Sequence, residues 1–206
     1  DFVYIALVSA LLVVYNFFIS PLIPKVGTVT TYFYYPIIGE TFLVMLAAAL
    51  VGKPGSAGLT MVIYTLLSDI VHYGFGGEPF YFIYEATAYG AIIDMWLIYR
   101  GRYYMMPFRG VLGGAASSRA LNGGSEELEE ELKPARALFV VDALLGGIPI
   151  SMAFPFWYRG FWATFISGYT YTPGFWAITS IASIGAGAVL GLVVAPFIYY
   201  IKRVLT

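Results

Sequence analysis

Apolar stretches close to twenty residues long recur along the chain, and they constrain its fold more than any other feature. The first, "FVYIALVSALLVVYNFFIS" at 2–20, contains no charged residue. Of all 206 residues 60% are hydrophobic and 11% are charged, whereas a typical soluble domain has about 25% charged residues. A helix needs about 20 apolar residues to cross a bilayer, and helices satisfy their own backbone hydrogen bonds there. The sequence therefore predicts an all-α, polytopic integral membrane protein.

Proline and glycine separate the apolar stretches and predict where the helices begin and end. "GKPGS" at 52–56 ends the second helix, and "GFGGEP" at 74–79 ends the third. Pro149 and Pro155 are expected to kink or shorten the fifth. The prediction is a single transmembrane domain over 1–206. Its bundle of six transmembrane helices covers about 2–20, 36–52, 57–75, 79–99, 137–156 and 175–201.

The segment 101–136 is polar and interrupts the apolar pattern. It contains "GGAASSRALNGG" followed by "SEELEEELKPAR", which predicts a loop and then a short acidic helix that ends at Pro134. A helix of this kind is most often a solvated part of a loop. A docking surface for a partner protein is the alternative.

Basic residues predict which side of the membrane each loop faces, because Lys and Arg are enriched in cytoplasmic loops. Six spans put both termini on one side. The basic residues on that side are Lys53, Arg100, Arg102, Arg109, Arg119, Lys133, Arg136, Lys202 and Arg203. The other side has only Lys25 and Arg159. We therefore expect a multi-pass protein of the cell (plasma) membrane with both termini and the long loop in the cytoplasm. The formal net charge of −1 gives no indication of a nucleic-acid partner.

Ionisable residues within the predicted spans gather near the outer ends of the helices. Charge inside a span is costly, and by default it marks a functional site that faces the bundle interior. The residues at this outer level are Glu40, Asp69, His72 and Glu85. Glu78 lies in the turn between the third and fourth predicted spans. Asp94 and Asp142 fall toward the inner side.

Aromatic residues are dense on the same predicted outer side, above all in "FPFWYRGFWATFISGYTYTPGFW" at 154–176. Interfacial Trp and Tyr usually form a belt at the membrane surface. Combined with carboxylates and few cations, they are also typical of a pocket for a flat aromatic cation. The candidates for stacking are Tyr34, Tyr81, Trp157, Trp162, Tyr169 and Tyr171, and the candidates for polar contacts are Glu40, Asp69, His72 and Glu85.

Catalytic and metal-binding signals are few. Asp69 and His72 are three residues apart, so they share one face of an α-helix and are weak candidates for metal ligands. The chain has one His and no Cys. It contains no nucleophile motif, phosphate-binding loop or redox-cofactor signature. We expect a non-catalytic protein without a cofactor, and a metal-dependent membrane enzyme remains an alternative.

Small residues at helical spacing let helices approach closely in lipid. In the last span, Gly185, Gly187 and Gly191 predict packing within the bundle. In the first span, Ala6 and Ala10 are four residues apart. These two alanines could face either the bundle or another subunit.

Three short motifs carry a resemblance to a known family: "AAALVGKPGSAGL" at 47–59, "SGYTYTPGFWAI" at 167–178, and Ala6-xxx-Ala10. The pattern resembles the substrate-binding S components of energy-coupling factor (ECF) transporters, most of all the YkoE-type branch associated with hydroxymethylpyrimidine or thiamine. The resemblance implies a binding subunit without an ATPase of its own, which captures a small aromatic cation from outside. It also implies a transmembrane coupling protein in contact with Ala6 and Ala10, and two ABC-type ATPases. Met61 stands where we expect a Glu in that branch.

A second resemblance supports a different class of function. The region "VGKPGSAG" is also similar to small multi-helix subunits of archaeal copper membrane monooxygenases. The segment 110–135 is foreign to the S-component pattern. The alternative is therefore an accessory or structural subunit of a larger membrane complex, respiratory or monooxygenase-like, with an S-component-like fold.

Overall fold

The computed structural model describes residues 1–23, 37–73, 86–106, 125–153, 155, 164–165, 168 and 170–205, with backbone alone for 72–73, 88 and 125–135. Within these residues the regular secondary structure is helical and there is no strand. The all-α prediction is therefore confirmed.

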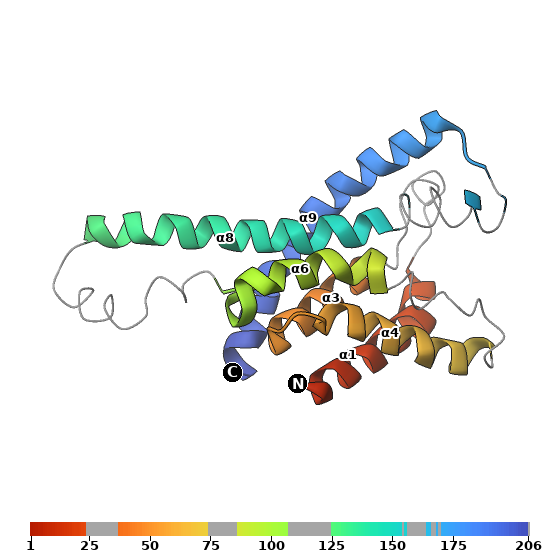
Figure 1. Cartoon of the computed structure of the whole chain (residues 1–206), viewed down its shortest axis with the longest axis horizontal. Helices are drawn as coiled ribbons and strands as arrows, with labels where there is room; N and C mark the ends of the chain where they lie inside the picture. The colour runs from red at the N-terminus through yellow and green to blue at the C-terminus, as the bar shows by residue number, and fades with distance from the viewer. Residues whose placement is uncertain are drawn as a thin grey trace.

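Each predicted span contains helix in the described part of the chain (Figure 1). The elements are α1 (Phe2–Val14), continued by the π-helix η1 (Tyr15–Ile19) and the 3-10 turn η2 (Ser20–Leu22); α3 (Ile37–Val51); α4 (Ser56–Ser68), continued by the π-helix η3 (Asp69–Tyr73); the π-helix η4 (Ala86–Gly90), which leads into α6 (Ala91–Arg100) and the 3-10 turn η5 (Gly101–Tyr103); α8 (Ser125–Met152); and α9 (Pro173–Leu205). Among the described residues, the helices long and apolar enough to cross a membrane are Phe2–Leu22 and Pro173–Leu205. Shorter apolar helices cover Ile37–Val51 and Ser56–Val71.

The prediction of a separate acidic helix was wrong. α8 runs without interruption from Ser125 through Pro134 and Pro149 to Met152. Its N-terminal part extends beyond the rest of the bundle (Figure 1). A proline inside a helix removes one backbone hydrogen bond, but Pro134 is flanked by Glu, Leu, Lys, Ala and Arg, which are strong helix formers. The helix therefore continues from the acidic segment into the apolar one.

A tight glycine turn joins α3 to α4, as "GKPGS" predicted. Gly52 and Gly55 have φ angles of 63° and 90°, which favour glycine because it has no Cβ. A Cβ added to Gly52 would lie 2.8 Å from Cα of Arg102. This turn therefore packs directly against the backbone that follows α6.

Glycines also let the backbones of α8 and α9 meet. A Cβ added to Gly147 would lie 2.8 Å from Cα of Gly191, and one added to Gly187 would lie 2.8 Å from Cα of Ile148. The predicted packing within the bundle is therefore confirmed for Gly187 and Gly191. It was wrong for Gly185, which faces outward with nothing within 4 Å of an added Cβ.

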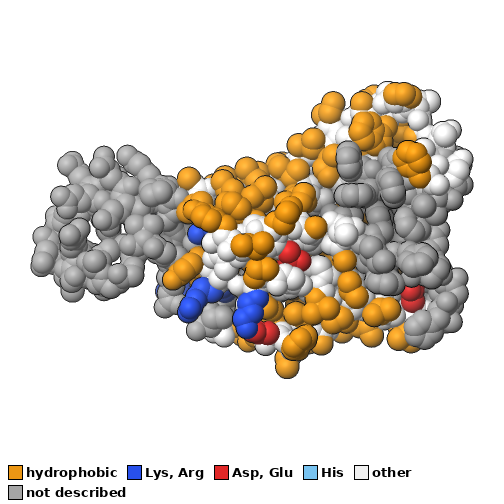
Figure 2. All heavy atoms as spheres, in the orientation of Figure 1, with side chains coloured by type: hydrophobic (Ala, Val, Ile, Leu, Met, Phe, Trp, Pro, Cys, Tyr) orange, Lys and Arg blue, Asp and Glu red, His pale blue; other side chains and the backbone are white. Residues whose placement is uncertain are grey.

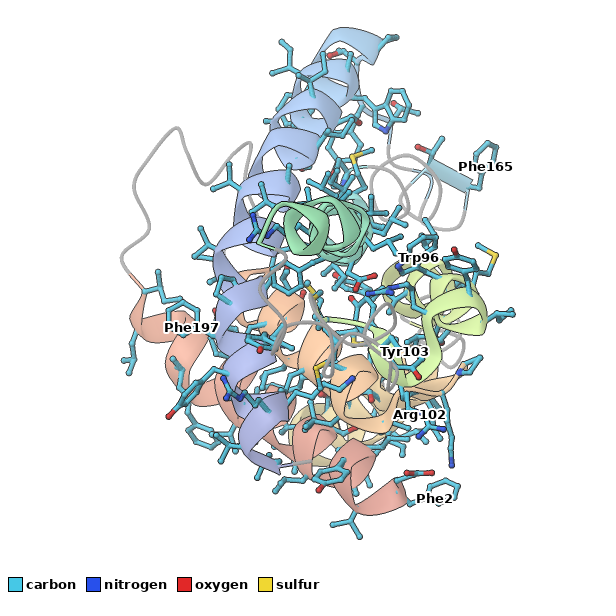
Figure 3. All side chains as sticks on the ribbon, turned by 90° about the vertical axis from the view of Figure 1, so that its left-hand side faces the viewer. Phe2, Trp96, Arg102, Tyr103, Phe165 and Phe197 are labelled. Carbon is cyan, nitrogen blue, oxygen red and sulfur yellow. The ribbon has the colours of Figure 1, made fainter. Side chains whose placement is uncertain are left out.

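One buried carboxylate, that of Asp142 in α8, organises the packing of α8 against α6 and the turn that follows α6. It accepts hydrogen bonds from Nε1 of Trp96 at 2.7 Å and from the backbone N–H of Met105 at 2.8 Å. It also forms a buried ion pair with Arg100, whose Nε and Nη2 both donate at 2.9 Å. Figure 3 looks along α8 and shows Trp96 beside it. The carboxylate therefore ties α6 and the segment after it to α8.

α9 holds the same segment from another side. Nζ of Lys202 donates to the carbonyl oxygens of Arg102 at 2.7 Å and Tyr104 at 2.9 Å. Met105 has a φ of 60°, which is uncommon for a residue other than glycine. The contacts of the neighbouring residues with α8 and α9 hold it in this conformation.

Tyr104 is completely buried in this turn. Burial raises the pKa of its phenol well above the usual range, and the charge of Asp142 raises that pKa further. The phenol therefore stays protonated, and it donates to the carbonyl oxygen of Asp142 at 3.5 Å.

Asp94 of α6 performs a second structural task. Its carboxylate accepts hydrogen bonds from the backbone N–H groups of Ala57 at 3.0 Å and Gly58 at 2.8 Å. These belong to the first turn of α4, where N–H groups have no partner within the helix and the helix dipole favours a negative charge. Asp94 and Asp142 thus serve to join helices.

We expect Gly187→Ala to lower stability, because its new methyl group would press on the α8 backbone. Overpacking of this kind costs about 1–3 kcal/mol. Gly185→Ala is the matched control, two residues away on the same helix, and it should keep or raise the melting temperature because alanine favours helix. Thermal unfolding of the purified proteins in detergent compares the two. Equal melting temperatures would contradict the close crossing of α8 and α9.

Asp142→Asn should destabilise the protein strongly, because it leaves the buried Arg100 guanidinium without a counter-charge. Loss of one partner of a buried ion pair costs about 3–5 kcal/mol. Lys53→Gln removes the exposed ion pair between Lys53 and Asp1 and should change stability little, since exposed pairs contribute about 0–1 kcal/mol. Denaturant titration in detergent measures both variants. A small effect of Asp142→Asn would show that the carboxylate does not hold α6 and the following turn against α8.

Candidate functional site

A cluster of one carboxyl group, one amide and tyrosines lies where α1 passes into η1, α3 begins and α4 approaches its end. We call it the Glu40 cluster; its members are Tyr15, Asn16, Glu40, Tyr64 and Tyr89. Four separate helical segments contribute to it: η1, α3, α4 and η4.

Glu40 stands at the centre of the cluster and is 3% exposed. Its Oε1 accepts a hydrogen bond from Nδ2 of Asn16 at 3.1 Å. The same Nδ2 donates to the hydroxyl of Tyr64 at 2.7 Å. Tyr89 is a further hydrogen-bonding neighbour of the carboxyl group. The amide of Asn16 therefore links η1, α3 and α4.

Tyr15 lies against α3 beside Glu40. Its ring occupies the space into which a Cβ of Gly39 would project. Only glycine at this position allows the ring to approach the α3 backbone so closely. The result is an aromatic wall next to a buried carboxyl group.

π-Helical geometry accompanies the cluster. Tyr15 and Asn16 lie in η1, and Tyr89 lies in η4, both of which are π-helical. α4 also passes into a π-helix, η3, directly after Ser68. A π-helical turn shifts the direction of the side chains that follow it, and such turns occur frequently at functional sites.

In the described part of the chain, no basic side chain forms an ion pair with the carboxyl group of Glu40. There the ion pairs join Lys53 to Asp1 and Arg100 to Asp142. A buried carboxylate is costly without a compensating partner. The cluster therefore suits a positively charged group held between tyrosine rings.

The structure describes only some of the predicted site residues. Glu40 is in the cluster, whereas Asp69 begins η3, is half-buried and makes no hydrogen bond to Glu40. Tyr171 stacks on Phe175 in the first turn of α9, with ring centroids 5.8 Å apart. The side chain of His72 is outside the described set, and so are Glu85, Tyr34, Tyr81, Trp157, Trp162 and Tyr169.

The prediction of a shared face for Asp69 and His72 assumed an α-helix. The structure has the π-helix η3 at these positions, and its wider turn changes which residues share a face. Among the described side chains, no three His, Asp or Glu come together as metal ligands. A metal site at these two residues stays a prediction.

Ala6 and Ala10 both lie on the exposed side of α1. Ser9 of α1 is buried and donates to the carbonyl oxygen of Thr60 in α4 at 2.9 Å. α1 therefore packs on α4 through Ser9. The predicted contact of Ala6 and Ala10 with another subunit remains a prediction.

Four members of the cluster were not predicted from the sequence: Tyr15, Asn16, Tyr64 and Tyr89. A signal for Asn16 was present, because it is the one amide residue in the first apolar stretch, and polar residues inside a span mark functional positions. The tyrosines carried no comparable signal, since 18 tyrosines are spread along the chain.

Comparison of the chain with protein-family models, with curated proteins and with solved structures finds no match.

Proposed function

We propose that the chain is the substrate-binding membrane subunit of an ECF-type vitamin transporter. In this proposal it spans the plasma membrane six times, with both termini in the cytoplasm. The Glu40 cluster binds a small aromatic cation that arrives from outside. The observation that carries the proposal is the buried carboxyl group of Glu40, set among tyrosines and without a described basic partner.

The distribution of polarity supports a membrane location. Large apolar side chains are exposed along α1, α6 and α9, among them Phe2, Leu7, Leu11, Met95, Ile98, Ile181, Val189, Val193 and Phe197. Figure 2 shows hydrophobic side chains over most of the described surface of one face, and Figure 3 labels Phe2 and Phe197. Soluble proteins rarely expose contiguous apolar patches of such extent. Lipid is the environment that fits this surface.

The buried charged side chains also fit a membrane environment. Asp142, Arg100, Lys202 and Glu40 are all buried. Charged residues in membrane helices face the bundle interior and pair with one another or with backbone carbonyls. Asp142 and Arg100 form such a pair, and Lys202 donates to carbonyl oxygens.

The ligand class in this proposal comes from two sources. The chemistry of the Glu40 cluster favours a cation next to aromatic rings. The resemblance to YkoE-type S components adds thiamine and hydroxymethylpyrimidine as the compounds to test first. A coupling protein that contacts Ala6 and Ala10 and two ATPases would supply the energy, and the exposure of both alanines is compatible with that contact.

The alternative proposal is an accessory subunit of a larger membrane complex. It is favoured by the N-terminal part of α8, which extends past the bundle (Figure 1) and carries the "SEELEEEL" segment. Purification in mild detergent separates the two proposals. A coupling protein with ATPases among the co-purifying chains supports transport, and oxidase or monooxygenase subunits support the alternative.

Single-cysteine labelling tests the proposed topology, because the chain has no cysteine of its own. Lys53 and Thr170 are exposed and lie on opposite sides in the proposed arrangement. We expect a membrane-impermeant maleimide to label Thr170→Cys in intact cells, and Lys53→Cys only after the membrane is opened. Labelling of both variants from outside would contradict an odd number of spans between these positions.

Calorimetric titration of the purified protein tests the proposed function. We expect a compound in a panel of thiamine, hydroxymethylpyrimidine and related heterocycles to bind with a Kd of about 1 μM or below, roughly −8 kcal/mol. Nicotinate, an aromatic anion, is the matched negative control and should not bind because Glu40 repels it. A flat titration against the whole panel would overturn the proposal.

A further inference from the structure

The hydrogen-bonding capacity of the Glu40 cluster is unevenly divided between donors and acceptors. Asn16 has two N–H groups on its amide, and both are used, one toward Glu40 and one toward Tyr64. Oε2 of Glu40 and Oδ1 of Asn16 are buried and have no hydrogen-bond partner among the described residues. The hydroxyl oxygen of Tyr15 is also buried without a hydrogen-bond partner among the described residues.

These atoms share one chemical property. A carboxylate oxygen and an amide oxygen can only accept hydrogen bonds, and a phenol oxygen can accept as well as donate. Buried polar atoms in folded proteins are nearly always hydrogen-bonded. Glu40 and Asn16 are adjacent, since one hydrogen bond joins them, and the Tyr15 ring lies against Gly39, the residue before Glu40. The unsatisfied acceptors therefore belong to one place.

We propose that the ligand of the Glu40 cluster is an organic cation that presents N–H groups to the cluster, such as a primary ammonium, an amidinium or an aminoheterocycle, rather than one that presents only fully alkylated nitrogen. This inference rests on the proposed function, because it deepens the chemistry of the same site. The charge of such a cation pairs with Glu40. Its N–H groups donate to Oε2 of Glu40, to Oδ1 of Asn16 and to the Tyr15 hydroxyl.

A quaternary ammonium group would leave these acceptors unsatisfied. Aromatic rings alone attract quaternary and protonated amines alike, so Tyr15, Tyr64 and Tyr89 do not select between them. The unsatisfied acceptors do select between protonated and quaternary amines, because a site built to hydrogen-bond a ligand discriminates strongly against an analogue that lacks the donor. The cluster therefore combines aromatic attraction for a cation with selection for its N–H groups.

Benzylammonium and benzyltrimethylammonium form a matched pair of probes with the same ring and the same charge. We expect the wild-type protein in detergent to bind benzylammonium about tenfold more tightly or better, since hydrogen bonds to a charged acceptor are the strong ones. Benzyl alcohol, which has the ring but no charge, should bind more weakly than benzylammonium. Calorimetry with each probe gives the ratio of the two dissociation constants.

Asn16→Leu provides the second measurement. It removes one of the unsatisfied acceptors at similar volume, so the preference for benzylammonium should fall by severalfold, with benzyltrimethylammonium affinity affected less. The ratio within one variant controls for changes in folding. Equal affinities of the wild type for the two cations, or a preference for the quaternary one, would overturn this inference and leave the proposed cation site standing. Absence of binding by all three probes and by the heterocycle panel would overturn both.

Discussion

The architecture depends on the buried carboxylate of Asp142. It receives hydrogen bonds from Trp96, Arg100 and the backbone of Met105, so it holds α6 and the following turn against α8. Lys202 binds that turn to α9 through two carbonyl oxygens. Because isolated charges are costly in an apolar environment, these groups are stable only together. The turn after α6 is consequently held from two sides, by α8 and by α9.

The comparison of Asp142 with Glu40 explains how one chain contains a structural acid and a candidate binding acid. Both side chains are buried. Both oxygens of Asp142 accept from protein donors, and a guanidinium balances its charge. Glu40 receives the amide of Asn16 on Oε1, while its Oε2 has no partner among the described residues. Complete pairing is what a structural role requires, whereas incomplete pairing leaves capacity for a ligand.

Much of the helical organisation could be predicted from the sequence, because apolar stretches and Gly/Pro breaks determine where helices form locally. The turn at 52–56 is an example. The prediction that a helix ends at Pro134 was wrong because the helix-forming residues around this proline outweigh its helix-breaking effect. The predicted packing of Gly185 within the bundle was wrong because Gly185 and Gly187, two residues apart on one helix, face different directions.

The roles of the acids were harder to predict for a physical reason. A position within a span shows that a charge is costly, but it does not show which donors reach it. Asp94 caps α4 from another helix, and Asp142 takes its donors from α6 and the turn after it. Such partners are distant in sequence, so only the packed structure separates these acids from Glu40. The cluster itself depends on Asn16 and three tyrosines whose approach is set by helix packing and by Gly39.

The central claim is that Glu40 supplies the negative charge that binds a cation, and charge removal at this position tests it most directly. Glu40→Gln should weaken benzylammonium binding by about 30-fold or more, the usual effect of removing one partner of a buried charge pair. Glu127→Gln makes the same chemical change near the start of α8, at the end that extends past the bundle, and should leave the affinity unchanged. Unchanged affinity in Glu40→Gln, with its melting temperature preserved, would contradict the account.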